Sequence, residues 1–183
     1  DRYCLAGLFS SRVTADYGIA LGHHAVVTGE GGVAMGKGEF RSLLKAEGRQ
    51  SVSMGCSTVA TSDYSVALGN QSTTVNHNSN FAMGTFACAS GRISMGLYSK
   101  STGLSSISIG EGSELVPNVS SGNTSVAIGF MCKSTGDFSV ALGRQNESSG
   151  QSSFSVNSEN KSLGLNSFTG GSLSVTSGAN SFT

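Results

Sequence analysis

A five-residue phrase, of which Ser-Val-Ala-Leu-Gly is one copy, recurs along the chain and constrains its fold more than any other feature. We number each repeat from the first residue of this phrase, which is position 1. Position 1 falls at Gly18, Gly32, Ser51, Ser65, Asn80, Arg92, Ser106, Ser125, Ser139, Ser153, Ser167 and Ser181. The steps between them are 14, 19, 14, 15, 12, 14, 19, 14, 14, 14 and 14 residues. Such a period is typical of a solenoid, in which each repeat forms one coil.

Large and small side chains alternate within the phrase. Position 2 is Ile, Val or Phe, position 3 is Ala, Ser or Thr, and position 4 is large in every repeat that reaches it except at Gly170. An alternation with period two predicts a β-strand rather than a helix. Glycine recurs at position 5, where it allows the positive φ of a tight corner, and again at position 12, which marks a second corner. Each coil should therefore run as strand, turn, strand and turn.

The pattern leaves two ways to pack a coil. If positions 1, 3, 8 and 10 point inward, the roll is flat and the large residues at positions 2 and 4 form an apolar stripe outside it. Such a stripe exceeds what a soluble monomer normally exposes, so copies of the chain would have to cover it. Alternatively, positions 2 and 4 fill a fatter roll, and a monomer could be soluble. The small residues at positions 3 and 8 favour the flat roll.

Composition excludes several kinds of partner. Charged residues are 12% of the 183 residues and the formal net charge is zero, whereas a nucleic-acid surface needs clustered Lys and Arg. No apolar run is long enough to cross a bilayer, so we expect no direct membrane insertion of this segment. The chain begins with Asp1 and shows no signal peptide, so we expect a processed, trimmed or excerpted sequence.

Two adjacent repeats carry a family resemblance. Ser125-Val126-Ala127-Ile128-Gly129 and Ser139-Val140-Ala141-Leu142-Gly143 resemble the head repeats of YadA-like trimeric autotransporter adhesins, and the resemblance runs from about Tyr17 to Thr183. It implies an all-β fold, a left-handed parallel β-roll or solenoid that assembles as a homotrimer with the large residues near the threefold axis. The residues expected at that axis are Val66, Leu68, Val126, Ile128, Val140 and Leu142.

The same resemblance implies a function. It indicates a non-enzymatic adhesin head on an extracellular or cell-surface fibre, with a host-surface or matrix protein or a glycan as partner. Similar repeats occur in the trimeric tail fibres of bacterial viruses, so a fibre on a virion surface and a purely structural spacer remain open. A glycan-cleaving enzyme would need paired carboxylates across a groove, and the solvated face of the repeat offers few acids. We therefore expect no catalytic residue, no metal site and no cofactor.

Two repeats have 19 residues, five more than the usual 14. We expect residues 1–17 to form an N-terminal cap or incomplete coil and residues 18–183 about twelve coils, with looped insertions at 37–50 and 111–124. Extra residues in a solenoid leave it as loops, which commonly carry binding sites, although a clasp between chains is the alternative. The first insertion gathers charges and large apolar residues in a chain poor in charge. Its candidate partner-binding residues are Lys37, Phe40, Arg41, Leu43, Leu44, Lys45 and Arg49.

Two further patterns predict little. The four cysteines, Cys4, Cys56, Cys88 and Cys132, match no zinc or redox spacing. Asn-X-Ser sequons begin at Asn70, Asn118, Asn123, Asn146 and Asn160, but this Ser-rich composition produces several by chance.

Overall fold

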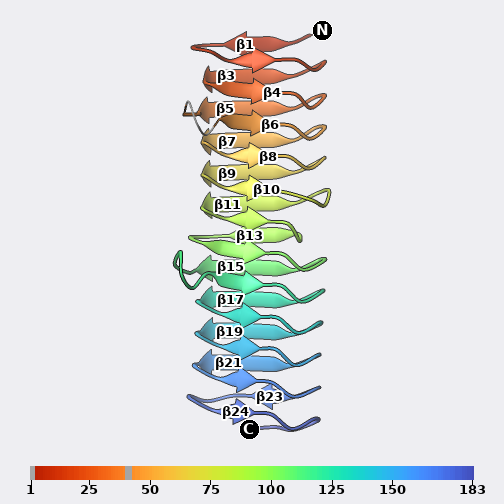
Figure 1. Cartoon of the computed structure of the whole chain (residues 1–183), viewed down its shortest axis with the longest axis vertical. Coiled ribbons are helices and arrows are strands. Elements are labelled where there is room, and N and C mark those ends of the chain that lie inside the picture. Colours follow the sequence, from red (N-terminus) through yellow and green to blue (C-terminus); the bar gives the residue numbers. More distant parts are fainter. Residues whose placement is uncertain (1–2, 40–42) are drawn as a thin grey trace. The chain divides into compact units, whose positions relative to one another are not determined.

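The computed structural model describes residues 3–39 and 43–183, which divide into an N-terminal unit, residues 1–89, and a C-terminal unit, residues 90–183. None of the described residues is helical. In each unit, successive coils contribute one strand to each of two parallel sheets (Figure 1). The expected all-β parallel solenoid is thus confirmed within each unit, and the two units are described separately below.

The N-terminal unit contains six coils. Its first sheet is built from β1 (Leu5–Gly7), β3 (Ile19–His23), β5 (Val33–Lys37), β7 (Val52–Cys56), β9 (Val66–Asn70) and β11 (Phe81–Thr85). Its second sheet is built from β2 (Arg12–Val13), β4 (Ala25–Val27), β6 (Leu44–Ala46), β8 (Val59–Ala60), β10 (Thr73–Thr74) and β12 (Cys88–Ala89). Equal positions pair between coils, as Val52 with Val66. Because β1 and β2 pair with β3 and β4, a regular coil precedes Gly18.

The C-terminal unit repeats this arrangement. Its first sheet is built from β13 (Ile93–Met95), β15 (Ile107–Glu111), β17 (Val126–Phe130), β19 (Val140–Arg144), β21 (Phe154–Ser158) and β23 (Phe168–Thr169). Its second sheet is built from β14 (Ser99–Ser101), β16 (Asn118–Ser120), β18 (Lys133–Ser134), β20 (Glu147–Ser148), β22 (Lys161–Ser162) and β24 (Val175–Thr176). Here too equal positions pair, as Val126 with Val140.

The interior of each unit is thin and filled by small side chains. Position 3 is fully buried from Ala20 to Thr169, and so are the position 8 and position 10 residues of most coils, such as Ser99 and Ser101. Large residues at positions 2 and 4 point away from this interior and remain partly exposed. The flat roll is therefore confirmed, and the fatter roll with positions 2 and 4 inside is wrong.

Most polar interior side chains are satisfied by hydrogen bonds, the exceptions among the described residues being atoms of Ser62, Asn80 and Ser153. Ser139 donates to the carbonyl of Gly136, and its hydroxyl lies 2.7 Å from that of Ser134, at position 10 of the preceding coil. Asn146, at position 8, accepts a hydrogen bond from the Asn160 N–H at 2.9 Å. Its amide group donates to the carbonyls of Leu142 and Asn157. Because the sheets are so close, a short side chain can usually reach a backbone partner.

Glycine at position 5 lies within the first strand, as Gly129 does in β17, and not at the expected corner. Its backbone takes a positive φ of 132°, and a Cβ there would lie 1.9 Å from the Gly143 carbonyl oxygen. The left-handed residue of the first corner is at position 7, as at Gln145 with φ of 52°.

At position 12, at the second corner, the coils stack so tightly that a Cβ on Gly136 would lie 2.1 Å from the Gly150 carbonyl oxygen. The left-handed residue of this second corner is at position 14 and is not glycine, as at Tyr64 and Phe138, both with φ of 57°.

The insertions are shorter than the expected loops. In the first, β5 ends at Lys37 and β6 starts at Leu44, so the extra residues are confined to 38–43. In the second, β15 ends at Glu111 and β16 starts at Asn118, which confines them to 112–117. In both coils the insertion follows position 6, where the first strand ends. Residues 44–50 and 118–124, which were expected within the loops, form the ordinary second strand and second corner of their coils.

Candidate interaction surfaces

The outer face of the first sheet is an apolar surface in each unit. Its residues come from positions 2 and 4 and stand in register from coil to coil, as Met54 beside Leu68 and Ile128 beside Leu142. They bury part of their surface against their neighbours, yet Ile128 keeps 39% of its surface exposed. We call this surface the apolar face. Such a surface can pack against another apolar surface.

The six residues expected at a threefold axis all lie on this face. Val66 and Leu68 are on β9 of the N-terminal unit. The other four are in the C-terminal unit, with Val126 and Ile128 on β17 and Val140 and Leu142 on β19. The strand alternation therefore brings them to one side of their sheet in each unit, where a second copy could reach them.

The residues expected to bind a partner at the first insertion do not form one group. Phe40 and Arg41 lie outside the described residues. Lys37 is exposed at the end of β5, and Leu43 is half-buried beside the insertion. Leu44 has no exposed surface and belongs to the core cluster with Ala25 and Val27, so its assignment to a binding surface was wrong. It occupies position 8, which faces the interior, and the insertion ends before it.

The other two residues of this set are engaged in ion pairs. Lys45 on β6 lies 3.1 Å from the Glu47 carboxylate. Arg49 is at the second corner, where its N–H and its Nε donate to Asp63 of the next coil at 2.8 and 2.9 Å. These hydrogen bonds lower the pKa of Asp63, and the bond from the backbone N–H has the larger effect. Lys45 and Arg49 thus contribute to the regular coil rather than to the loop.

The described side chains give little support for a metal site or a reactive cysteine. Among residues 3–39 and 43–183, no three His, Cys, Asp or Glu side chains gather closely enough to hold a metal ion. Cys132 is buried at position 8, where its thiol donates to the Gly143 carbonyl at 3.2 Å, and burial raises the pKa of this thiol. A raised pKa disfavours the reactive thiolate. The described residues include no helix long and apolar enough to cross a membrane.

Comparison with known proteins agrees with this geometry. A family model described as the YadA head domain repeat, in two copies, matches residues 14–38, 46–72, 120–146 and 134–155. The matched segments lie in both units and cover the strands that carry most of the apolar face. No curated protein matches the chain.

Proposed function

The chain carries YadA head domain repeats, and from this premise we propose that it is the head of a trimeric surface fibre that attaches to a host or extracellular surface. The proposed head is a homotrimer of left-handed β-rolls outside the cell. The observation that supports assembly is the apolar face, which each coil extends by two large residues. A soluble chain needs a cover for an apolar surface that continues over several strands, and copies of the same chain supply one.

In this proposal three apolar faces meet around the threefold axis. Val66, Leu68, Val126, Ile128, Val140 and Leu142 pack there against the same residues of two other chains. The outer face of the second sheet is a poor alternative in the C-terminal unit, because its position 9 holds charged residues, among them Lys133, Glu147 and Lys161 in register. Charges of this kind are depleted from the cores of protein interfaces.

Val126→Asp tests the assembly. A carboxylate buried at the axis without a partner costs several kcal/mol, about 4 or more, so the variant should sediment as a monomer at micromolar concentration while the parent chain sediments as a trimer. Val119→Asp is the matched control, because Val119 is also half-buried but lies on the second sheet. A monomeric parent chain, or equal loss of assembly in both variants, would contradict the proposal.

Attachment is the second part of the proposed function. A coil of Ser, Ala and Gly offers little chemical identity, so an interruption of the repeat is where recognition of a matrix protein or glycan can reside. We assign this role to the first insertion, residues 38–43, together with Lys37. Lys37 is exposed beside the insertion and Leu43 is half-buried at its end, which combines a charge with an apolar side chain as protein interfaces commonly do.

The attachment test shortens the first insertion to a single residue, as in the ordinary coils, and measures binding of the trimer to immobilised extracellular-matrix extract. We expect saturable binding by the parent and at least a tenfold loss in the shortened chain. The matched control shortens residues 112–117 in the same way. Absence of binding by an intact parent trimer would favour a structural spacer, and undiminished binding after shortening would remove the insertion from the site.

A further inference from the structure

The second insertion is a closed turn that presents one large apolar side chain. The Ser113 N–H donates to the Val116 carbonyl at 2.9 Å, and the Val116 N–H donates to the Ser113 hydroxyl at 3.0 Å. The Gly112 N–H donates to the Leu97 carbonyl at 2.8 Å and ties the turn to the preceding coil. Between these bonds Leu115 is 93% exposed. A turn held in this way can offer Leu115 to a partner without a large loss of conformational entropy.

The surface around this turn is apolar and continuous with the apolar face. Position 6 points to the same side of the first sheet as positions 2 and 4. In the two flanking coils position 6 is Leu97 and Phe130, both exposed, and in the insertion coil it is Glu111, which pairs in register with Phe130. Glu114 adds a second exposed carboxylate within the turn. We call Leu97, Glu111, Glu114, Leu115 and Phe130 the insertion edge.

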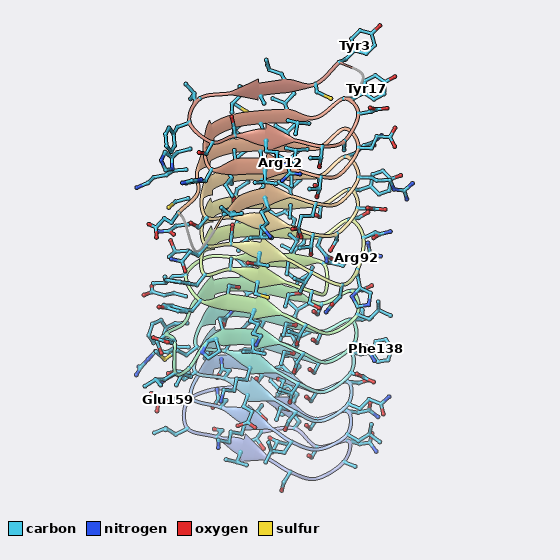
Figure 2. The ribbon with its side chains drawn as sticks, turned by 45° about the horizontal axis from the view of Figure 1, so that its top comes forward. Tyr3, Arg12, Tyr17, Arg92, Phe138 and Glu159 are labelled. Carbon is cyan, nitrogen blue, oxygen red and sulfur yellow. The ribbon has the colours of Figure 1, made fainter. Side chains whose placement is uncertain are left out.

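The opposite edge of the C-terminal unit carries complementary chemistry. Leu104 is 53% exposed and Phe138 is 57% exposed, both at the second corner of their coils. Arg92 is exposed at the same edge. Its neighbour Gly91 occupies the interior instead, where a Cβ on Gly91 would come within 2.3 Å of the Ser106 hydroxyl. Figure 2 shows Arg92 and Phe138 along this edge, with Glu159 along the other. We call Arg92, Leu104 and Phe138 the corner edge.

Rotational symmetry relates these two edges. When three flat coils place their apolar faces around one axis, an edge of each coil must meet the other edge of the next coil, because a cyclic ring uses heterologous contacts. Leu104 comes two residues before Ser106, where the insertion coil begins, so it lies at the level of that coil. Apolar side chains then meet apolar side chains, and the carboxylates of one edge meet a guanidinium of the other.

We propose that the insertion edge of the C-terminal unit docks on the corner edge of a second copy of this chain and acts as a clasp that fixes the order of the chains around the axis. This inference rests on the proposed trimer. Leu115 packs beside Leu104 and Phe138 of the adjacent copy, and Glu111 and Glu114 face its Arg92. Complementary charges at an interface rim act mainly on the register and specificity of association, and the apolar contacts supply most of the stability.

The test compares Leu115→Asp and Leu104→Lys, alone and combined, with Leu163→Asp as the matched control. Leu163 is also an exposed leucine, at 39%, but it follows β22 on the outer side of the second sheet, away from the first corner. The measured quantity is the urea concentration at which the trimer dissociates, followed by sedimentation at one fixed protein concentration. Each single edge variant should lower this midpoint as expected for a dissociation constant raised at least tenfold, whereas Leu163→Asp should leave it unchanged.

The combined variant places an aspartate opposite a lysine across the contact and should regain at least half of the lost stability of the trimer. A parent trimer in which Leu115→Asp and Leu163→Asp behave alike, or in which the two edge changes simply add, would overturn the clasp and leave the trimer proposal standing. A parent chain that sediments as a monomer would overturn both, and that outcome is seen without any variant.

Discussion

The two units share one backbone plan but differ in what fills it. In the N-terminal unit the interior combines apolar and polar side chains, with Ala25, Val27, Leu44 and Ala46 in one core cluster and serine or threonine buried in the coils that follow. In the C-terminal unit the same positions are mostly serine or asparagine, and the buried apolar residues shrink to Ala127, Cys132 and Ala141. Both interiors are equally closed to solvent, since position 3 and position 10 are fully buried in nearly every coil.

The difference shows that this fold selects interior residues by size and local bonding rather than by polarity. A buried hydroxyl or amide is costly when it lacks a partner, but in a roll this thin backbone carbonyls lie beside most interior positions. Ser134 and Ser139 bond to each other, and Ser139 also reaches the Gly136 carbonyl. The polar interior should therefore be as stable as the apolar one while its hydrogen bonds are complete, and much less stable when one is removed.

The largest expected effect comes from removing an interior asparagine of the C-terminal unit. Asn146→Leu keeps the volume of the side chain but leaves the Asn160 N–H and the carbonyls of Leu142 and Asn157 without their partner. Each unsatisfied buried group costs about 1–3 kcal/mol, so the free energy of unfolding should fall by roughly 3 kcal/mol or more. Urea unfolding at a fixed protein concentration measures the change.

The matched variant in the N-terminal unit is Leu44→Val, because Leu44 occupies the same position 8 without a hydrogen bond to lose. Removing one methylene there should cost about 1 kcal/mol. Equal losses for Asn146→Leu and Leu44→Val would mean that the amide bonds contribute nothing beyond filling space, and the contrast between the two interiors would disappear.

A smaller effect is expected from exchanging a hydroxyl and a methyl between the units. Ser134→Ala removes one bond of Ser139, which keeps its bond to the Gly136 carbonyl, so the free energy of unfolding should fall by about 1 kcal/mol. The reverse change, Ala60→Ser, places a hydroxyl at position 10 beside Ser65, which itself donates to the Ser62 carbonyl. It recreates the bonding of the C-terminal unit and should be close to neutral. A large loss for Ala60→Ser in thermal unfolding would show that the interiors are not interchangeable.

Much of this architecture was readable in the sequence because the coil repeats. The period gave the pairing of equal positions, and the small residues at position 3 identified the flat roll, both of which the structure confirms. The limits of the insertions were misjudged, because the second strand is short and its positions 8 and 10 accept residues as different as Leu44 and Asn118. With so weak a pattern, Leu44 looked like part of a loop.

Other features could not be predicted from the sequence. The left-handed backbone at position 14 carries Tyr17, Tyr64 and Phe138, so no glycine marks it. Three of the sequons begin at Asn118, Asn146 and Asn160, which are fully buried, and their serines occupy the buried position 10. These sequons arise from the interior pattern of asparagine at position 8 and serine at position 10, so an oligosaccharide could not be attached to them in the folded chain. The exposure of the insertion edge was equally hidden, because position 6 shows no regular residue type.

The smallest expected effect distinguishes the second corners of the two units and depends on pH. In the N-terminal unit Asp63 accepts hydrogen bonds from the Arg49 N–H and guanidinium, whereas in the C-terminal unit Asp137 accepts one from the Asn123 N–H. The pKa of Asp63 is lowered by these bonds, chiefly by the backbone N–H. Its folded pKa therefore lies below the unfolded value of about 3.9. The stabilisation is present above that value and is lost as the pH falls through the folded pKa.

Asp63→Asn isolates this contribution, because the asparagine still accepts a hydrogen bond from the Arg49 N–H but does not titrate. The chain itself supports this choice, since Asn123 accepts a hydrogen bond from the Leu104 N–H at the same position. The parent chain should lose more of its thermal unfolding midpoint than the variant between pH 5 and about pH 2.5, by an amount smaller than that of either interior change because the pair is exposed. Parallel curves for the two proteins over this range would mean that the carboxylate contributes nothing to stability. The guanidinium of Arg49 would then give the corner of the N-terminal unit no advantage over the corner at Asp137, where the carboxylate accepts a hydrogen bond from the Asn123 N–H.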